Sequence, residues 1–251
     1  MYTPLKGKIA LVTGAGSGIG RAHCELLAAR GAAVIVNDLH ADAAHETVAL
    51  VRAAGGQALA CVADVSQGAS VAQAFAAAQR QLGAVDILVN NAGIPGGMRP
   101  LEDIDEAAID AMFAVTVKGA MLCTQAVLPA MKQRRSGKII NTASITAYGT
   151  HRNVSAYAAS KGAIISLTRA WAREFAEWNI HVNAVAPGRV QTPMSAGLSA
   201  NPEYAREVQL RVPLGRRAQP QEIACVVAFL ASADADYMTG QILGPNGGEV
   251  M

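Results

Sequence analysis

At residues 13–20 the chain reads Thr-Gly-Ala-Gly-Ser-Gly-Ile-Gly, directly after an apolar run at residues 8–13 and directly before a helical pattern at residues 19–30. Glycines in a turn between a strand and a helix let the backbone approach a pyrophosphate closely. The free N–H groups and the partial positive charge of the helix N-terminus attract that anion. The spacing departs from a strict Gly-x-Gly-x-x-Gly because Ile19 stands where the last glycine is expected. The stretch predicts a dinucleotide-binding turn, and an ordinary glycine-rich turn is the alternative.

Short β-branched runs alternate with longer helical patterns along the rest of the chain. Strands are expected at residues 8–13, 33–37, 58–62, 87–90, 137–142, 181–186 and 241–243. Helices are expected at residues 19–30, 41–54, 70–82, 106–133, 155–178, 202–211 and 220–232. This order predicts repeated βαβ units, and therefore an α/β fold of three layers with a doubly wound, mostly parallel sheet between helices. The segment at residues 189–216 interrupts the alternation and is expected to cover the substrate.

Composition narrows the class of protein. The 251 residues are 51% hydrophobic, enough for a sizeable core, and no linker divides them, so we expect one domain over residues 1–251. The formal charge is +2 and the basic residues are scattered, which argues against a nucleic-acid partner. Four widely spaced cysteines fit reduced thiols. Without a secretory signal or an apolar run of about 18 residues, we expect a cytoplasmic protein with no membrane partner and no metal site.

An acidic residue ends the second expected strand. Asp38 follows Gly18 by twenty residues, where a carboxylate accepts hydrogen bonds from the hydroxyls of an adenosine ribose. The same carboxylate repels a 2′-phosphate, and neither Ser17 nor Leu39 supplies a cation nearby. NAD is therefore expected rather than NADP, and a helix-capping role for Asp38 is the alternative.

Two further segments lie at the ends of the third and fourth expected strands. Asp64 and Val65 are expected at the adenine edge, with a simple turn as the alternative. The fourth strand ends in Asn90, Asn91, Ala92 and Gly93. Ligands of open parallel sheets bind at the carboxyl ends of the strands, so both segments are expected beside the cofactor.

A tyrosine and a lysine lie four residues apart in the helix expected at residues 155–178. Tyr157 and Lys161 therefore share one face of that helix. A phenol has an unperturbed pKa of about 10, and the cation of Lys161 makes it a usable base near neutrality. Tyr157 is expected to take or give the proton of an alcohol, while Ser144, after the fifth strand, hydrogen-bonds the substrate oxygen. A chance pair with a solvated lysine is the alternative.

The sixth strand runs into a turn. Pro187 and Gly188 end the strand, and the backbone after them, through Val190, is expected to hold the carboxamide of nicotinamide together with the Thr192 hydroxyl. Taken alone, this segment is an ordinary turn.

In their order along the chain, these segments resemble the short-chain dehydrogenase/reductase family in its single-domain form, and the resemblance covers essentially the whole chain. It implies a Rossmann fold with a seven-stranded sheet, NAD(H) or NADP(H) as cofactor, and chemistry without a metal. The matching motifs are the phosphate turn, the acid that selects NAD, the Asn-Asn-Ala-Gly segment, the catalytic Ser, Tyr and Lys, and the nicotinamide segment. Their positions are Gly14, Gly18, Gly20, Asp38, Asn90, Gly93, Ser144, Tyr157, Lys161, Pro187, Gly188 and Thr192.

One position departs from the family pattern. Thr116 stands where the resemblance implies an Asn that holds a water linking the lysine to solvent. A threonine hydroxyl also binds water, so Thr116 is counted among the catalytic residues and activity is expected to survive. The resemblance further implies a homotetramer that pairs the long helices expected at residues 106–133 and 155–178.

The expected function is interconversion of a secondary alcohol and a ketone with NAD(H), acting on a small molecule. The residues expected to touch that substrate are Ser144, Ile145, His151, Arg152 and Tyr157. Arg152 is a candidate anchor for an anionic substrate. One alternative is a 3-oxoacyl-carrier-protein reductase using NADPH, against which Asp38 and Trp178 count. Another is a dinucleotide sensor or scaffold without chemistry, which Thr116 alone favours.

Overall fold

The computed structural model describes residues 3–95, 97–149, 151–199 and 201–251. Within these residues, seven strands form one sheet in the order β3-β2-β1-β4-β5-β6-β7, and every neighbouring pair is parallel. The strands are β1 (Ile9–Val12), β2 (Ala33–Asp38), β3 (Gln57–Val62), β4 (Ile87–Asn90), β5 (Gly137–Thr142), β6 (Ile180–Val185) and β7 (Ile242–Leu243). The predicted parallel α/β sheet is confirmed.

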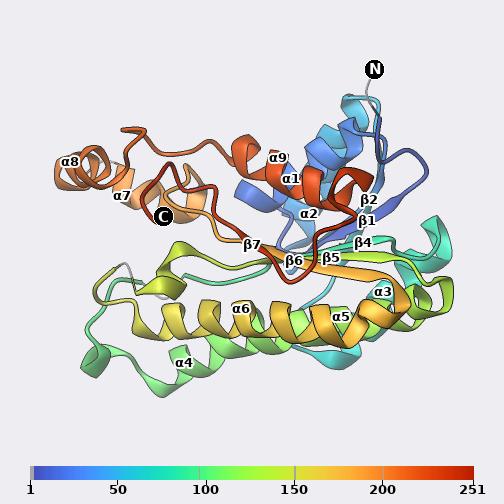
Figure 1. The fold of residues 1–251 in the computed structure, drawn as a ribbon, viewed down its shortest axis with the longest axis horizontal. Helices are drawn as coiled ribbons and strands as arrows, with labels where there is room; N and C mark the ends of the chain where they lie inside the picture. Colours follow the sequence, from blue (N-terminus) through green and yellow to red (C-terminus); the bar gives the residue numbers. More distant parts are fainter. Residues whose placement is uncertain (1–2, 96, 150, 200) are drawn as a thin grey trace.

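Helices cover both faces of the sheet (Figure 1). One face carries α1 (Gly18–Ala29), α2 (Ala41–Ala53) and α9 (Pro220–Ala231). The other face carries α3 (Gly68–Leu82), α5 (Gly119–Arg134) and α6 (Ser155–Phe175). Outside these layers lie α4 (Glu106–Phe113), α7 (Ala196–Ser199) and α8 (Pro202–Arg211), the last two beyond one end of the sheet. Short 3₁₀ turns are η1 (Leu101–Asp103), η3 (Ile145–Tyr148), η4 (Ala176–Trp178), η5 (Pro193–Ser195) and η6 (Ala233–Ala235).

Successive side chains along each strand point to opposite faces of the sheet and so pack into two apolar layers. On β1, Ala10 and Val12 face the layer beneath α1, α2 and α9, whereas Leu11 faces the layer beneath α3, α5 and α6. Phe75 and Met131 are fully buried in the second layer. Because helices cover both faces, the strands read in the sequence as continuous apolar runs.

The chain changes direction across the sheet at β1. From β1 the chain moves outward through β2 to β3, and then returns to β4 on the other side of β1 and continues to β7. The connections that leave the carboxyl ends of β1 and β4 therefore diverge, and this reversal opens a crevice where ligands of doubly wound sheets bind.

The helix expected at residues 106–133 forms, but not as a regular α-helix. Between α4 and α5 lies a π-helical turn, η2 (Ala114–Lys118). Val115, Thr116 and Val117 are β-branched and lower helix propensity, so a departure from α geometry costs little here. Hydrophobic periodicity alone predicts an uninterrupted helix and therefore misses this turn.

The helical run Glu106–Arg134 is long and apolar enough to cross a membrane by length and composition. In the fold, its α5 segment packs on the sheet between α3 and α6, where Cys123, Val127 and Met131 are buried. Core helices of soluble proteins pass the same test, so length and composition alone do not make this run a membrane span.

Candidate active site

The glycine-rich turn connects β1 to α1, as the sequence predicts. Gly14 has a φ of +59°, and a Cβ there would lie 2.9 Å from the Cα of Ala92. A Cβ on Gly20 would overlap the carbonyl oxygen of Gly14. The N-cap residue Ser17 makes no side-chain hydrogen bond to α1. The first-turn N–H groups of α1 are therefore available to an anion.

Asn91 and Thr13 fix this turn against the end of β4. Asn91 Nδ2 donates to the carbonyl oxygens of Thr13 and Gly14, at 2.9 and 3.1 Å. Thr13 Oγ1 accepts hydrogen bonds from the backbone N–H groups of Asn91 and Ala92, both at 3.0 Å. Asn91, expected to bind the cofactor, thus also positions the backbone that would carry the phosphates.

Asp38 lies at the end of β2 beside the turn. Its Oδ2 accepts from the Gly16 N–H at 2.8 Å, and its Oδ1 accepts from the His40 N–H at 3.0 Å. Each oxygen retains a lone pair for a further donor such as a ribose hydroxyl. A Cβ on Gly16 would lie 2.8 Å from Asp38 Oδ2, so this close approach requires glycine.

A groove of about 290 Å³ runs along these residues toward α6. Its lining residues are Gly14, Ser17, Gly18, Ile19, Gly20, Asp38, His40, Asn91, Ala92, Gly93, Thr142, Tyr157, Lys161, Thr192, Pro193 and Met194. The groove combines glycine backbone, a helix N-terminus, a carboxylate and a lysine in one channel. This is the arrangement that a dinucleotide requires.

Three residues expected to bind the cofactor do not line this groove, namely Leu39, Asp64 and Val65. Leu39 is 58% exposed. Asp64 Oδ1 accepts from the Ser66 N–H at 2.8 Å and so forms a turn, the alternative stated for it. Val65 packs into the apolar layer beneath α3 and α5. Their contact with an adenine ring remains a prediction.

Asn90 also lies away from the groove. Its Nδ2 donates to Asn141 Oδ1 at 2.9 Å and to Thr124 Oγ1 at 3.1 Å, within the sheet and its covering helix. Because side chains alternate along a strand, Asn90 faces the interior while Asn91 faces the groove. Asn90 therefore couples β4 to β5 and α5 beneath the site.

Ser144, Tyr157 and Lys161 come together at the inner end of the groove. The Tyr157 hydroxyl is hydrogen-bonded to Ser144. Lys161 Nζ lies 5.7 Å from the centroid of the Tyr157 ring and donates to the Thr142 carbonyl oxygen at 2.7 Å. Tyr157 lines both the groove and an adjoining second cavity, so its phenol stands at the junction of the two.

Burial sets the acid–base state of this trio. It raises the pKa of the Tyr157 phenol above its ordinary value, and the hydrogen bond with Ser144 opposes part of that rise. It lowers the pKa of the Lys161 ammonium to about 8. Lys161 is still protonated at neutral pH, and any further positive charge near Tyr157 would favour the phenolate and lower the pKa of the phenol.

The π turn η2 brings Thr116 to the same place. A Cβ on Gly93 would lie 3.4 Å from Lys161 Nζ and 3.6 Å from Thr116 Oγ1, so both side chains border the space above Gly93. Thr116 Oγ1 and Thr142 Oγ1 are buried without a hydrogen-bond partner. Buried hydroxyls of this kind are seats for ordered water or ligand atoms.

The second cavity has a volume of about 240 Å³. Among the residues expected to touch substrate or nicotinamide, it is lined by Ser144, Ile145, His151, Tyr157, Pro187, Gly188, Val190 and Thr192. Arg152 is exposed and is not among its lining residues. Besides Val190 and Thr192, the expected cover at residues 189–216 contributes Arg189, Met194, Ser195, Tyr204 and Glu207 to the wall. Residue 200 of this segment lies outside the described residues.

A buried charge cluster borders the second cavity. Arg189 Nε donates to Glu249 Oε1 and Oε2 at 3.0 and 3.2 Å, and Arg189 Nη2 donates to Glu207 Oε1 at 2.9 Å. Arg189 Nη2 also lies 3.1 Å from His151 Nε2. The side chains of Arg189 and Glu249 are only 5% and 4% exposed. We refer to these four residues as the Arg189 cluster; it joins α8, the loop before α6 and the C-terminal segment.

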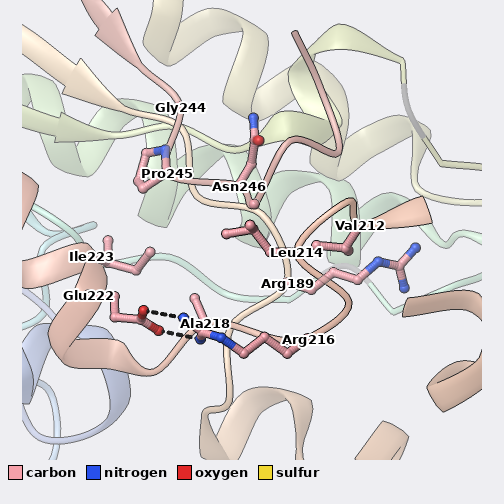
Figure 2. A pocket seen from close by; sticks show the side chains of 11 residues that line it. Arg189, Val212, Leu214, Arg216, Ala218, Glu222, Ile223, Gly244, Pro245 and Asn246 are labelled. Atoms are coloured by element: carbon pink, nitrogen blue, oxygen red, sulfur yellow. Dashed lines mark hydrogen bonds and ion pairs between the residues drawn. The ribbon is translucent and has the colours of Figure 1, made fainter. Parts of the chain in front are cut away.

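The C-terminal segment after β7 folds back beside this cluster. The Leu214 N–H donates to the Gly247 carbonyl at 3.1 Å, and Asn246 Nδ2 donates to the Val250 carbonyl at 2.9 Å. Figure 2 shows a third cavity, of about 230 Å³, between this segment and the start of α9. The Arg216–Glu222 pair closes one side of it, and the guanidinium of Arg189 points away from that pair (Figure 2).

Sequence reasoning did not find several residues of the site. His40 lines the groove but belongs to no motif. Pro193 and Met194 also line it, although the sequence placed them only in the expected substrate cover at residues 189–216. Glu249 had no local signal at all, because it meets Arg189 only through the fold, 60 residues away.

Comparison with known proteins decides the family. The family described as "Enoyl-(Acyl carrier protein) reductase" matches residues 14–249. The chain belongs to the short-chain dehydrogenase/reductase family. It is accordingly an oxidoreductase with a Rossmann fold, as the ordered motifs predict.

Relatives in this family differ in substrate and cofactor. The 3-oxoacyl-[acyl-carrier-protein] reductase of Thermotoga maritima is 40% identical over 98% of this chain and 99% of its own. A gluconate 5-dehydrogenase from Burkholderia cenocepacia, solved with NADP and tartrate, has a TM-score of 0.94 and 35% identity, covering 99% and 97% of the two chains. A 7α-hydroxysteroid dehydrogenase, solved with NADH and 7-oxo glycochenodeoxycholic acid, has a TM-score of 0.93 and 37% identity, covering 98% and 96%.

Proposed function

We propose that this protein interconverts a secondary alcohol and a ketone with NAD(H), with Tyr157 as the general acid and base. The single observation that carries the proposal is the position of Tyr157, which lines both the groove along the glycine-rich turn and the second cavity. Its hydroxyl is bonded to Ser144 and its ring lies 5.7 Å from Lys161 Nζ. A phenol between a cofactor groove and a substrate cavity can exchange a proton with an alcohol that faces the cofactor.

Each residue of the trio has a distinct task in this reaction. During oxidation the Tyr157 oxygen takes the hydroxyl proton of the substrate, and during reduction it returns that proton to the forming alkoxide. Ser144 donates a hydrogen bond to the substrate oxygen and stabilises the charge that develops there. Lys161 holds its proton near the phenol and supports the phenolate. The bound nicotinamide supplies the hydride acceptor, and in its oxidised form a positive charge.

Thr116 is included as the residue that carries the proton onward from Lys161. Its buried hydroxyl has no partner and borders the same space as Lys161 Nζ. A water seated there would accept a hydrogen bond from the lysine and give one to the threonine. This would replace the contact that an Asn makes in relatives that carry one at this position.

Asp38 supports the choice of NAD rather than NADP in this proposal. Its carboxylate lines the groove and is held by the N–H groups of Gly16 and His40. A 2′-phosphate at the ribose would meet this fixed negative charge. The test is the ratio of kcat/KM for NAD to that for NADP, expected to be about a hundredfold and to fall in Asp38→Ser. A ratio near one would contradict the assignment.

Residues 189–216 are proposed as the substrate cover, because seven of them line the second cavity. The proposal also includes a cytoplasmic homotetramer. It is supported by the exposed apolar side chains Phe113 and Met121, on the helices that pair in the expected assembly. Light scattering on the protein and on Met121→Glu tests the assembly, and a monomer in both cases would contradict it.

A 3-oxoacyl-carrier-protein reductase using NADPH is the second candidate, favoured by the identity with the Thermotoga maritima protein. Trp178 counts against this candidate in the sequence. In the structure, however, Lys132 Nζ lies 3.6 Å from the centroid of the Trp178 ring, so a cation is present beside Trp178. Reduction of acetoacetyl thioesters with NADPH at a rate above that of any alcohol with NAD would favour this candidate.

The deciding assay mixes the protein with NAD and a panel of secondary alcohols while following absorbance at about 340 nm. Formation of NADH with any alcohol, abolished in Tyr157→Phe, is the expected result. Dinucleotide binding without turnover of any alcohol or ketone would point instead to a sensor or scaffold.

A further inference from the structure

The Arg189 cluster borders the second cavity, and its bonding pattern restricts what the cavity accepts. Arg189 is the one cation among the described residues that line this cavity. A guanidinium in a substrate cavity is ordinarily a candidate anchor for a carboxylate or phosphate. The question is whether its donors are free.

The donors of Arg189 are already committed to protein acceptors. Of its five N–H groups, the Nε–H bonds Glu249, the two on Nη2 bond Glu207 and His151, and one on Nη1 lies 3.4 Å from Glu207 Oε2. The guanidinium also makes a hydrogen bond with the side chain of Tyr204. The whole Arg189 side chain is only 5% exposed. An incoming anion would have to displace a carboxylate that is already in place.

The net charge of the cluster is not positive. An arginine only donates, so the short contact with Arg189 requires His151 Nε2 to accept and the ring to be neutral there. Burial and the Arg189 charge also lower the pKa of His151. The carboxylates of Glu207 and Glu249 then exceed the one charge of Arg189. Arg211 Nε lies 3.2 Å from Glu207 Oε1 on the solvent side, and Arg211 is not among the residues that line the cavity.

The remaining wall of the cavity carries apolar and hydroxyl side chains, and none of the described residues in it is charged. Met98, Ile145 and Met194 line it beside Pro187 and Val190. A bound substrate would therefore face uncharged apolar and hydroxyl side chains and a cluster whose accessible charge, on Glu207, is negative. The Glu207 side chain is 36% exposed, whereas that of Arg189 is 5% exposed.

From this arrangement we infer that the substrate is an uncharged secondary alcohol or ketone, and that Glu207 disfavours substrates with a carboxylate remote from the reacting carbon. The inference rests on the proposed function and narrows its substrate class. A hydroxyl at the remote end of the substrate is accepted, because the Glu207 oxygens can receive its hydrogen bond. A carboxylate there meets like charge and no free donor of Arg189.

The test compares matched ring alcohols with NAD at a pH of about 8. The probes are 4-hydroxycyclohexanecarboxylate, its methyl ester and its carboxamide, which differ in charge and little in shape. The two uncharged probes are expected to have kcat/KM values at least about tenfold above that of the acid, which corresponds to one unfavourable charge contact at partial exposure. An acid turned over as well as the ester and the amide would overturn the inference.

A charge-removing variant ties the effect to the cluster. Glu207→Gln is expected to lower the ratio of kcat/KM for the ester to that for the acid by about tenfold. Glu203→Gln, on the exposed first turn of the same helix, is the matched control and should change neither value. An unchanged ratio of ester to acid in Glu207→Gln would contradict the role given to Glu207.

Binding separates this inference from the proposed function. Calorimetric titration of the NADH-saturated protein with cyclohexanecarboxamide and cyclohexanecarboxylate measures the same preference without turnover. Tighter binding of the amide supports the inference even if no alcohol is oxidised, an outcome that would refute only the proposed function. Tighter binding of the carboxylate refutes the inference whatever the turnover assay gives.

Discussion

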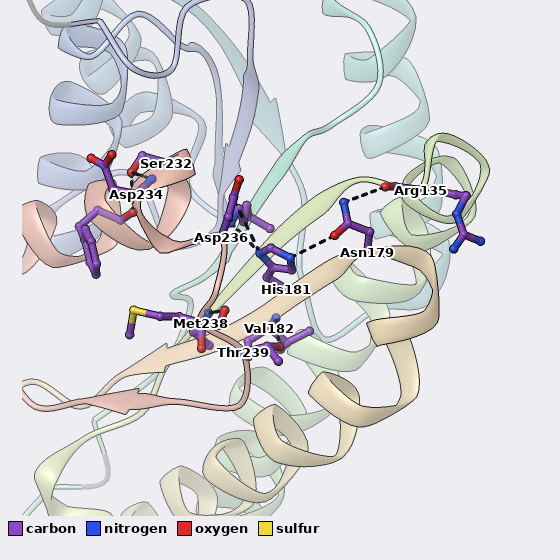
Figure 3. A network of polar contacts seen from close by, with 12 residues as sticks. Arg135, Asn179, His181, Val182, Ser232, Asp234, Asp236, Met238 and Thr239 are labelled. Atoms are coloured by element: carbon purple, nitrogen blue, oxygen red, sulfur yellow. Dashed lines mark hydrogen bonds and ion pairs between the residues drawn. The ribbon is translucent and has the colours of Figure 1, made fainter.

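The sheet has an amino edge, where its strands begin, and a carboxyl edge, where its strands end. Polar side chains are hydrogen-bonded in opposite ways at the two. At the amino edge, Lys138 of β5 lies 2.7 Å from His181 Nδ1 and 2.6 Å from Asp236 Oδ1. Figure 3 shows the ring of His181 between Asp236 and Asn179, with Asn179 reaching the Arg135 carbonyl. Every side chain of this network has a partner within it, and the network links β5 and β6 to the segment that follows α9.

At the carboxyl edge, the polar groups are left incomplete. Lys161 is 3% exposed and donates to one backbone carbonyl. Burial lowers the pKa of its ammonium group. The hydroxyls of Thr116 and Thr142 are buried without a partner. Groups that satisfy one another stabilise a fold, whereas groups left unsatisfied are available to ligands, so the contrast separates a structural edge from a reactive one.

Tyr157→Phe should produce the largest effect and tests the reactive edge directly. Loss of the phenolic proton is expected to lower kcat by about a thousandfold or more, with the Kd for NADH changed by less than about threefold. Steady-state kinetics and NADH fluorescence titration measure the two quantities. Tyr237→Phe, at a fully exposed position, is the control and should match the parent protein. Substantial turnover by Tyr157→Phe would show that the reaction does not depend on the side chains at the carboxyl edge.

Lys161→Met should lower kcat by about a hundredfold and yet stabilise the protein without cofactor. The pKa of Lys161 is lowered to about 8, so at neutral pH the folded state holds a charge that burial disfavours. Removing that charge is expected to add about 2 kcal/mol to the free energy of unfolding, after allowing about 1 kcal/mol for the lost hydrogen bond to Thr142.

The pH dependence of this gain has a defined sign. In the parent protein, the unfolded lysine keeps its proton up to its ordinary pKa, whereas the folded lysine loses it near pH 8. The stability of the parent therefore rises as pH increases above about 8, and the advantage of Lys161→Met shrinks over that range. Urea titrations at several pH values measure it, and a variant less stable at neutral pH would contradict the reasoning.

Lys138→Met is the counterpart at the structural edge. It removes the contacts to His181 and Asp236 and is expected to cost about 1 kcal/mol of unfolding free energy, since Asp236 is 63% exposed. Turnover should stay within about twofold of the parent value. If instead activity fell as it does in Lys161→Met, the division between the two edges would be wrong.

Thr116→Asn should have the smallest effect. Both side chains can bind a water beside Lys161, so kcat is expected to change by less than about fivefold. Pre-steady-state and steady-state rates at several pH values measure the step. An increase of orders of magnitude would show that Thr116 limits proton transfer in the natural protein.

Much of the fold follows from local sequence signals. The seven strands could be placed from β-branched runs, and the turn at residues 13–20 from its glycines, because backbone geometry there permits few alternatives. The spacing of Tyr157 and Lys161 predicts a shared helical face, and the two side chains do lie together.

The cluster around Arg189 could not be predicted in the same way. Arg189 meets His151 and Glu207 across 38 and 18 residues, and Glu249 across 60, so no local pattern relates them. Arg152, singled out from the sequence as an anchor for an anion, is exposed, whereas its neighbour His151 lines the cavity. Which of two adjacent loop residues faces inward depends on packing that the sequence does not display.

The π turn η2 has a consequence for the register of the outer helices. A π turn holds one residue more than the α-helical turn it replaces. Deleting one residue within Ala114–Lys118 would therefore restore a regular helix and rotate α4 by about 100° relative to α5. Phe113 would leave its present face, and Thr116 would leave the space above Gly93. Among homologous sequences, a gap in this short stretch would thus mark a different surface and a different proton path, even though no loop had changed length.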